Sequence, residues 1–149
     1  GAGPLEQELR EQAAALGLHH VHFVGRLGEE DKVALLQLCT AILFPSHLRS
    51  EAFGISLLEG AMYGKPMISS EIGTGTSYIN IHNETGLVVP PSDPLAFRAA
   101  MRTLWDNPLQ ALAMGQKAAL RYEQLFTAEQ MGRQMAKIYR EVVAEKSAR

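Results

Sequence analysis

Four short apolar runs alternate along the chain with segments of helical periodicity, and no other feature limits the possible folds as strongly. The runs cover residues 21–25, 41–44, 66–70 and 86–90. Short apolar strands that alternate with helices are typical of a parallel sheet with right-handed crossovers. We therefore expect an α/β fold, a Rossmann-like parallel sheet with helices on both faces.

The segments before, between and after these runs predict six helices. They are expected over residues 5–16 and 29–39, from Gly54, from residues 92–94 to about Asn107, from Pro108 and from Thr127. Thr127 with Gln130 has the spacing of a capping box. After Gly54, apolar residues recur at steps of three and four residues, at Ile55, Leu58 and Met62.

The last predicted helix carries an apolar stripe at helical spacing. Its members are Met131, Met135, Ile138, Tyr139 and Val142. Such a stripe is most simply a face that packs against the core.

Composition excludes several classes of protein. A chain of 149 residues with 46% apolar content is one domain by length, with a sizeable core. A net charge of −2 gives no electrostatic indication of nucleic-acid binding. The single cysteine, Cys39, excludes an internal disulfide framework and fits a reducing compartment. No apolar run approaches the roughly 18 residues of a membrane span, so we expect a soluble, cytoplasmic protein.

Three histidines, His19, His20 and His22, raise the question of a metal site. The start of a strand with polar alternation explains them better, and we expect no bound metal.

Two glutamates stand eight positions apart around Gly54. Glu51 precedes the glycine, and Glu59 follows it in an apolar run, about one and a half turns into the expected helix. A helix start presents unpaired N–H groups and a partial positive charge, which suit a phosphate. A carboxylate at Glu59 can accept two hydrogen bonds from a vicinal diol such as a ribose. The stretch predicts a nucleotide-sugar site, although solvated charges at a helix end would give the same pattern.

The predicted topology supports this site. In parallel sheets, ligands gather at the carboxyl ends of the strands. The loops at those ends cover residues 25–28, 45–54, 69–78 and 90–93, and three of the four carry glycine or hydroxyl groups. Within the third, residues 73–77 form a glycine-rich loop that is either a turn or a contact for phosphate or sugar.

From Gly1 to about Val143, the chain resembles the C-terminal, donor-binding domain of retaining family-4 glycosyltransferases with the GT-B fold. Seven motifs carry the resemblance, in family order. They are Gly1-Ala-Gly-Pro4, Val21-His-Phe-Val-Gly25, Phe44-Pro-Ser46, Glu51-x(7)-Glu59, Ala61-Met-Tyr-Gly-Lys-Pro66, Glu84-Thr-Gly-Leu-Val-Val-Pro90 and Asp93-Pro94.

The resemblance implies a role for the residues around Gly54. Glu51 would bind hydroxyls of the donor sugar and be the catalytic residue. Backbone N–H groups after it would contact the sugar and the distal phosphate, with a serine side chain beside them; these residues are Phe53, Gly54, Ile55 and Ser56.

The resemblance also assigns the nucleoside end of the donor. Glu59 would hold the ribose hydroxyls, and Arg26, Leu27 and Lys32 would receive the base. The implied reaction is transfer of a hexose from a nucleotide diphosphate to an acceptor hydroxyl with the anomeric configuration kept. It needs no metal or other cofactor, because positive side chains and helix starts stabilise the leaving diphosphate.

Departures from the family pattern narrow the prediction. The opening helix has no strand before it, so we infer that residues 1–149 are a partial nucleotide-sugar-binding domain. The N-terminal acceptor domain and the Arg/Lys diphosphate clamp are expected to be missing, which would leave the chain inactive alone. Tyr78 stands where the family usually has glutamate, and residues 73–80 resemble bacterial O-antigen and exopolysaccharide transferases. Several of those use GDP-mannose, which favours a GDP-mannose-like donor over a UDP-sugar.

The implied partners are a nucleotide-diphosphate sugar and a glycan or lipid-linked acceptor in the synthesis of cell-surface polysaccharide such as lipopolysaccharide. The expected location is the cytoplasm, at the inner face of the cytoplasmic membrane. Two alternatives stay open at this point. One is a non-catalytic Rossmann-like interaction module, and the other is a GT-B nucleotide-sugar epimerase.

Overall fold

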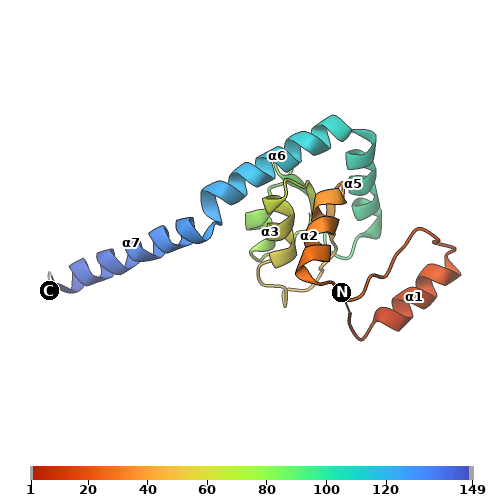
Figure 1. Ribbon diagram of the computed structural model, residues 1–149, viewed down its shortest axis with the longest axis horizontal. Helices are drawn as coiled ribbons and strands as arrows, with labels where there is room; N and C mark the ends of the chain where they lie inside the picture. The colour runs from red at the N-terminus through yellow and green to blue at the C-terminus, as the bar shows by residue number, and fades with distance from the viewer. Residues whose placement is uncertain (1, 148–149) are drawn as a thin grey trace. The chain divides into compact units, whose positions relative to one another are not determined.

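The computed structural model describes residues 2–147 and divides into two compact units. The first unit ends at Leu38 and the second begins at Cys39. Figure 1 shows the elements of both in chain order.

The first unit contains two helices, α1 (Glu6–Ala15) and α2 (Glu29–Leu38), and both were predicted. Arg10 on α1 contacts the segment that follows the helix. Its guanidinium lies 4.6 Å from the centroid of the Phe23 ring, and Nη2 donates a hydrogen bond to the Phe23 carbonyl over 3.4 Å. The cation–π contact and the hydrogen bond thus act on the same residue.

The predicted strand at residues 21–25 does not form. This segment makes no strand pairing with any other part of residues 2–147. Val21 and Val24 remain about half exposed, at 48% and 50%. The alternating pattern was therefore an insufficient signal, because a strand needs a neighbour to pair with as well as an apolar face.

The second unit is built on a parallel sheet, as predicted, although the sheet has three strands and not four. The strands are β1 (Ile42–Phe44), β2 (Met67–Ser70) and β3 (Gly86–Val89), in the order β1-β2-β3. Ile42 pairs with Met67, and Met67 pairs with Gly86. The helices of this unit are α3 (Ile55–Met62), α4 (Thr76–Ile79), α5 (Pro94–Asp106), α6 (Pro108–Leu125) and α7 (Ala128–Ser147).

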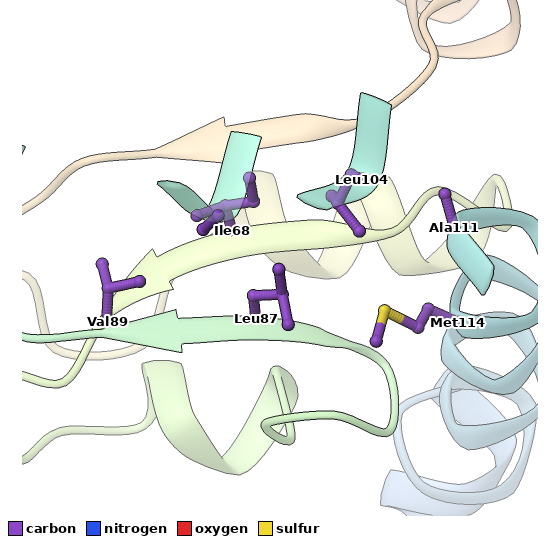
Figure 2. Close-up of a cluster of buried hydrophobic side chains, with 7 residues drawn as sticks. Ile68, Leu87, Val89, Leu104, Ala111 and Met114 are labelled. Carbon is purple, nitrogen blue, oxygen red and sulfur yellow. The ribbon is translucent and has the colours of Figure 1, made fainter. Parts of the chain in front are cut away.

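The core lies on both faces of this sheet. Figure 2 shows one cluster, in which Ile68, Leu87 and Val89 of the strands meet side chains of α5 and the start of α6. Met67, the neighbour of Ile68 on β2, belongs to the other cluster, with side chains of α3, α4 and α6. Adjacent residues of a strand point to opposite faces, so a strand covered on both sides reads as a continuous apolar run. All four residues of β2 are accordingly buried.

Helix α3 buries a different face from the one that its sequence periodicity indicated. Leu57, Gly60 and Ala61 are buried, whereas Ile55 is 69% exposed and Met62 is 51% exposed. The helix is apolar almost all round, so two faces satisfy the same periodicity. The face with small residues is the one that packs, because it lets the helix approach β1 closely.

Helix α7 begins as predicted but does not bury its stripe. The Thr127 side chain accepts a hydrogen bond from the N–H of Gln130 over 3.2 Å, which is one half of a capping box. The five stripe residues are between 49% and 66% exposed, so the expectation of a core-facing stripe is wrong. No helix among residues 2–147 is both long and apolar enough to cross a membrane.

Candidate functional site

The three strands direct their carboxyl ends to one edge of the sheet, where three loops begin. The loop after β1 carries Glu51 and leads into α3, the loop after β2 is glycine-rich, and the loop after β3 leads into α5. This is the edge at which parallel sheets bind ligands. The predicted convergence of residues 45–54, 69–78 and 90–93 is therefore present in the second unit.

Glu51 shapes the loop in which it lies. Its Oε1 accepts hydrogen bonds from the N–H of Phe53 over 3.2 Å and of Gly54 over 2.9 Å. Gly54 precedes the first residue of α3 with φ of 93° and ψ of 61°, a left-handed conformation that favours glycine. Two of the N–H groups predicted to face the donor are thus occupied by Glu51. Its Oε2 accepts no hydrogen bond from the described residues.

The first turn of α3 offers further donors. Leu57 N–H bonds to the Gly54 carbonyl over 2.9 Å, whereas the N–H groups of Ile55 and Ser56 donate to no group among residues 2–147. No side chain caps this helix start. Its partial positive charge and free N–H groups suit an anionic oxygen.

Glu59 lies on the same helix, on the second turn from its start. The residue is half-buried, whereas Leu57 and Ala61, two positions before and after it in the sequence, are buried. A partly buried carboxylate at this position can accept hydrogen bonds from hydroxyl groups without full desolvation.

The glycine-rich loop packs against the Glu51 loop and forms a hydrogen bond with it. Gly75 N–H donates to the Ala52 carbonyl over 2.9 Å. A Cβ at Gly75 would lie 2.8 Å from Cδ2 of Phe53 and 3.0 Å from the Ala52 oxygen, so only glycine fits. Residues 76–79, expected as part of the loop and its end, form the short helix α4.

An aromatic cluster supports the Glu51 loop from another direction. The ring of Phe53 lies edge-on to Phe126 at 6.2 Å, and Phe126 lies edge-on to Tyr78 at 5.7 Å. Arg121 donates to the Tyr78 carbonyl from Nη2 over 2.6 Å and stacks on the Tyr78 ring at 5.0 Å. Tyr78, which stands where the family pattern has glutamate, thus has a structural role here.

The sequence did not indicate a cavity that lies at this edge. A hollow of about 480 Å³ is lined by the loops after β1 and β3, the last residue of β2 and the first turns of α5. His47, Asp93 and Arg98 give it polar character, although Asp93 Oδ1 also accepts the N–H of Ala96 over 2.9 Å and so caps α5. Its lining includes neither Glu51 nor Glu59. Two features of the sequence could have indicated this cavity: His47 directly follows Phe44-Pro-Ser46, and Arg98 lies one turn after Pro94.

The residues predicted to receive the base lie in the first unit. Arg26 and Leu27 are exposed in the segment before α2, and Lys32 lies in its first turn. Lys32 Nζ forms an ion pair with Glu29 over 3.0 Å. Their role stays a prediction.

No group of three or more His, Cys, Asp and Glu side chains within residues 2–147 is arranged to hold a metal ion. Cys39 is half-buried, and burial raises the pKa of its thiol against the opposing effect of Lys65. The thiol is therefore a poor nucleophile at neutral pH.

Comparison with known proteins decides the family. A family model described as "Glycosyl transferases group 1" matches residues 1–121. The chain belongs to this family. The resemblance drawn from the seven motifs is thereby confirmed.

Two relatives of this glycosyltransferase chain are similar along most of its length. D-rhamnosyltransferase WbpZ of Pseudomonas aeruginosa is 77% identical over 128 residues, which are 86% of this chain and 34% of that protein. O-antigen chain mannosyltransferase C of Escherichia coli is 48% identical over 147 residues, which are 99% of this chain and 40% of that protein. The chain thus spans 34–40% of the length of these two relatives.

Solved structures confirm the fold. Sucrose-phosphate synthase of Thermosynechococcus elongatus superimposes with a TM-score of 0.84 at 28% identity, covering 97% of this chain and 37% of that one. HepE of Anabaena, solved with UDP, gives a TM-score of 0.83 at 22% identity, over 91% of this chain and 36% of that one. The chain has the α/β architecture of the C-terminal half of a GT-B fold.

Proposed function

We propose that this chain is the donor-binding domain of a retaining hexosyltransferase that uses a nucleotide-diphosphate sugar in the synthesis of cell-surface polysaccharide. The observation that carries the proposal is the 77% identity to a D-rhamnosyltransferase over 128 residues. The location of Glu51 and Glu59 beside one helix start, at the carboxyl edge of the sheet, supports it.

The sugar is proposed to have the manno configuration. D-rhamnose is 6-deoxy-D-mannose, so the sugars named for the two relatives share their ring stereochemistry. A GDP-mannose-like donor, GDP-D-rhamnose or GDP-mannose, fits both relatives and the family pattern of residues 73–80. Arg26, Leu27 and Lys32 are the proposed contacts of the base.

The geometry of the Glu51 loop supports the proposal that different residues bind the sugar, the diphosphate and the ribose of the donor. Oε2 of Glu51 is available to a sugar hydroxyl, while Oε1 holds Phe53 and Gly54. The N–H groups of Ile55 and Ser56, together with the helix charge, would stabilise the diphosphate as it leaves. Glu59, further along α3, would accept hydrogen bonds from the ribose hydroxyls.

In the proposed reaction, the bond between the anomeric carbon and the diphosphate oxygen breaks. A bond to the acceptor hydroxyl forms on the same face of the sugar, and the nucleoside diphosphate departs with the proton that the hydroxyl loses. The acceptor, a glycan or lipid-linked sugar, would bind to sequence that the relatives have and this chain does not span. A lipid-linked acceptor would place the reaction at the inner face of the cytoplasmic membrane.

A transfer assay with the complete polypeptide that carries these 149 residues tests the proposal. GDP-D-rhamnose, GDP-mannose and UDP-glucose are each offered with a lipid-linked glycan acceptor, and the product linkage is read by NMR. We expect an α-linked product from a GDP-sugar. Transfer from UDP-glucose alone, an inverted linkage, or donor turnover without any acceptor would contradict the proposal, the last in favour of an epimerase.

A further inference from the structure

We propose that Glu71 is a positioning residue, which sets the conformation of the Glu51 loop through the glycine-rich loop. The inference rests on the proposed function, because it assigns to Glu71 an effect on the sugar end of a bound donor. Its evidence is a continuous path of contacts from the sheet to Glu51.

The path starts on the sheet. Glu71 directly follows β2, and its N–H donates to the Val89 carbonyl of β3 over 2.8 Å. The backbone of Glu71 therefore continues the parallel pairing by one residue and is fixed to the rigid part of the second unit.

The Glu71 side chain then closes the glycine-rich loop. Oε1 accepts hydrogen bonds from the N–H of Gly73 and from Oγ of Ser77, each over 2.9 Å. One oxygen thus ties the beginning of the loop to the first turn of α4. A carboxylate that accepts two hydrogen bonds restricts the backbone between its two donors.

The glycine-rich loop contacts the Glu51 loop through Gly75, which is the middle residue of the glycine-rich loop. Gly75 donates to the Ala52 carbonyl over 2.9 Å and leaves no space for a Cβ beside Phe53. At Gly73, an added Cβ would lie 3.1 Å from Nη1 of Arg49. The two loops are therefore joined by a hydrogen bond at Ala52 and lie close together at Arg49, and Ala52 and Phe53 directly follow Glu51.

The last step reaches the sugar site. Oε1 of Glu51 is fixed by Phe53 and Gly54, so a shift of Ala52 and Phe53 moves the carboxylate that is proposed to bind the sugar. Glu59 lies on the second turn of α3, five residues after Gly54 in the chain. Loss of Glu71 should therefore disturb the sugar end of the donor and spare the ribose end.

Glu71→Ala and Glu71→Gln in the complete polypeptide separate positioning from general stability. Glutamine keeps an oxygen that accepts from Gly73 and Ser77, so it is the matched control. For Glu71→Ala, we expect kcat with GDP-mannose or GDP-D-rhamnose to fall about tenfold or more, because small displacements of a catalytic group are costly. The affinity for GDP alone should stay within about twofold, and Glu71→Gln should recover most of the activity.

Gly75→Ala provides a second route to the same result. Its Cβ would displace Ala52 and Phe53 while Glu71 stays intact, so kcat should fall and the affinity for GDP should persist. Unchanged kcat in both Glu71→Ala and Gly75→Ala would overturn the inference, and so would a parallel loss of GDP binding. Failure of the unsubstituted protein to bind GDP or to turn over either GDP-sugar would overturn the proposed function as well, and the two failures are distinguishable.

Discussion

Glu51 has a structural role that the sequence did not indicate, beside the donor-binding role that we propose for it. The sequence indicated a carboxylate before a helix start, and a ligand role followed from the family pattern. The structure adds that one of its oxygens holds the backbone of Phe53 and Gly54. That hydrogen bonding depends on the path of the loop in three dimensions, which spacing does not encode.

Asn80 is a residue whose importance the sequence did not indicate at all. The residue is fully buried, and its Nδ2 donates to Ser69 Oγ over 2.9 Å and to the Leu87 carbonyl over 3.2 Å. Its Oδ1 accepts from Thr85 Oγ1 over 3.2 Å. A polar residue after a helix reads as part of a loop, and only the packed structure shows that it joins β2 to β3.

Replacement of Asn80 by alanine should destabilise the protein substantially. Removal of one partner leaves buried polar groups unsatisfied, at a cost of about 1–3 kcal/mol in the free energy of unfolding. Urea denaturation measures the loss, with Gln116→Ala, an exposed position on α6, as the control. Equal midpoints for the two variants would show that the Asn80 network contributes nothing to stability.

At the scale of elements, the helices of residues 2–147 other than α4 could be predicted, and the buried faces of α3 and α7 could not. The capping and breaking residues of α1, α5, α6 and α7 are local signals, so their positions followed from the sequence. Helix α3 has apolar residues on almost every face, and contact with β1 determines which face is buried. For α7, the stripe is real in sequence, but nothing in the described part of the chain covers it.

Two substitutions on α3 test the assignment of its buried face. Leu57 is fully buried and Ile55 is 69% exposed, although both lie in the first turn. Leu57→Ala should lower the free energy of unfolding by about 2–5 kcal/mol, whereas exposed Ile55→Ala should change it by less than about 1 kcal/mol. Chemical denaturation of both variants side by side gives the comparison. A larger loss for Ile55→Ala would indicate that α3 buries the face that its periodicity predicted.

At the scale of the whole molecule, the sequence predicted the parallel sheet and the edge at which its loops gather. Three of the four predicted strands form, and the exception at residues 21–25 lacks a partner among the described residues. The family followed from motif order rather than from any single motif. The cavity beside His47 and Arg98 was missed because its walls come from segments that are distant in sequence: the loops after β1 and β3, the last residue of β2 and α5.

The second unit is a platform that supports the Glu51 loop from two sides. The glycine-rich loop and the aromatic cluster around Phe126 both bear on the Glu51 loop. The start of α3 then presents its N–H groups between Glu51 and Glu59. The central claim is that this platform binds a nucleotide-diphosphate sugar with the ribose at Glu59.

Calorimetric titration of GDP onto the complete polypeptide, unsubstituted and as Glu59→Ala, tests that claim most directly. Loss of a charged hydrogen-bonding partner should cost about 1.5–3 kcal/mol, or roughly 10- to 150-fold in Kd. Glu123→Ala, an exposed glutamate on α6, should leave the affinity unchanged. We expect weaker binding for Glu59→Ala alone, and equal affinity in all three proteins would contradict the ribose role of Glu59.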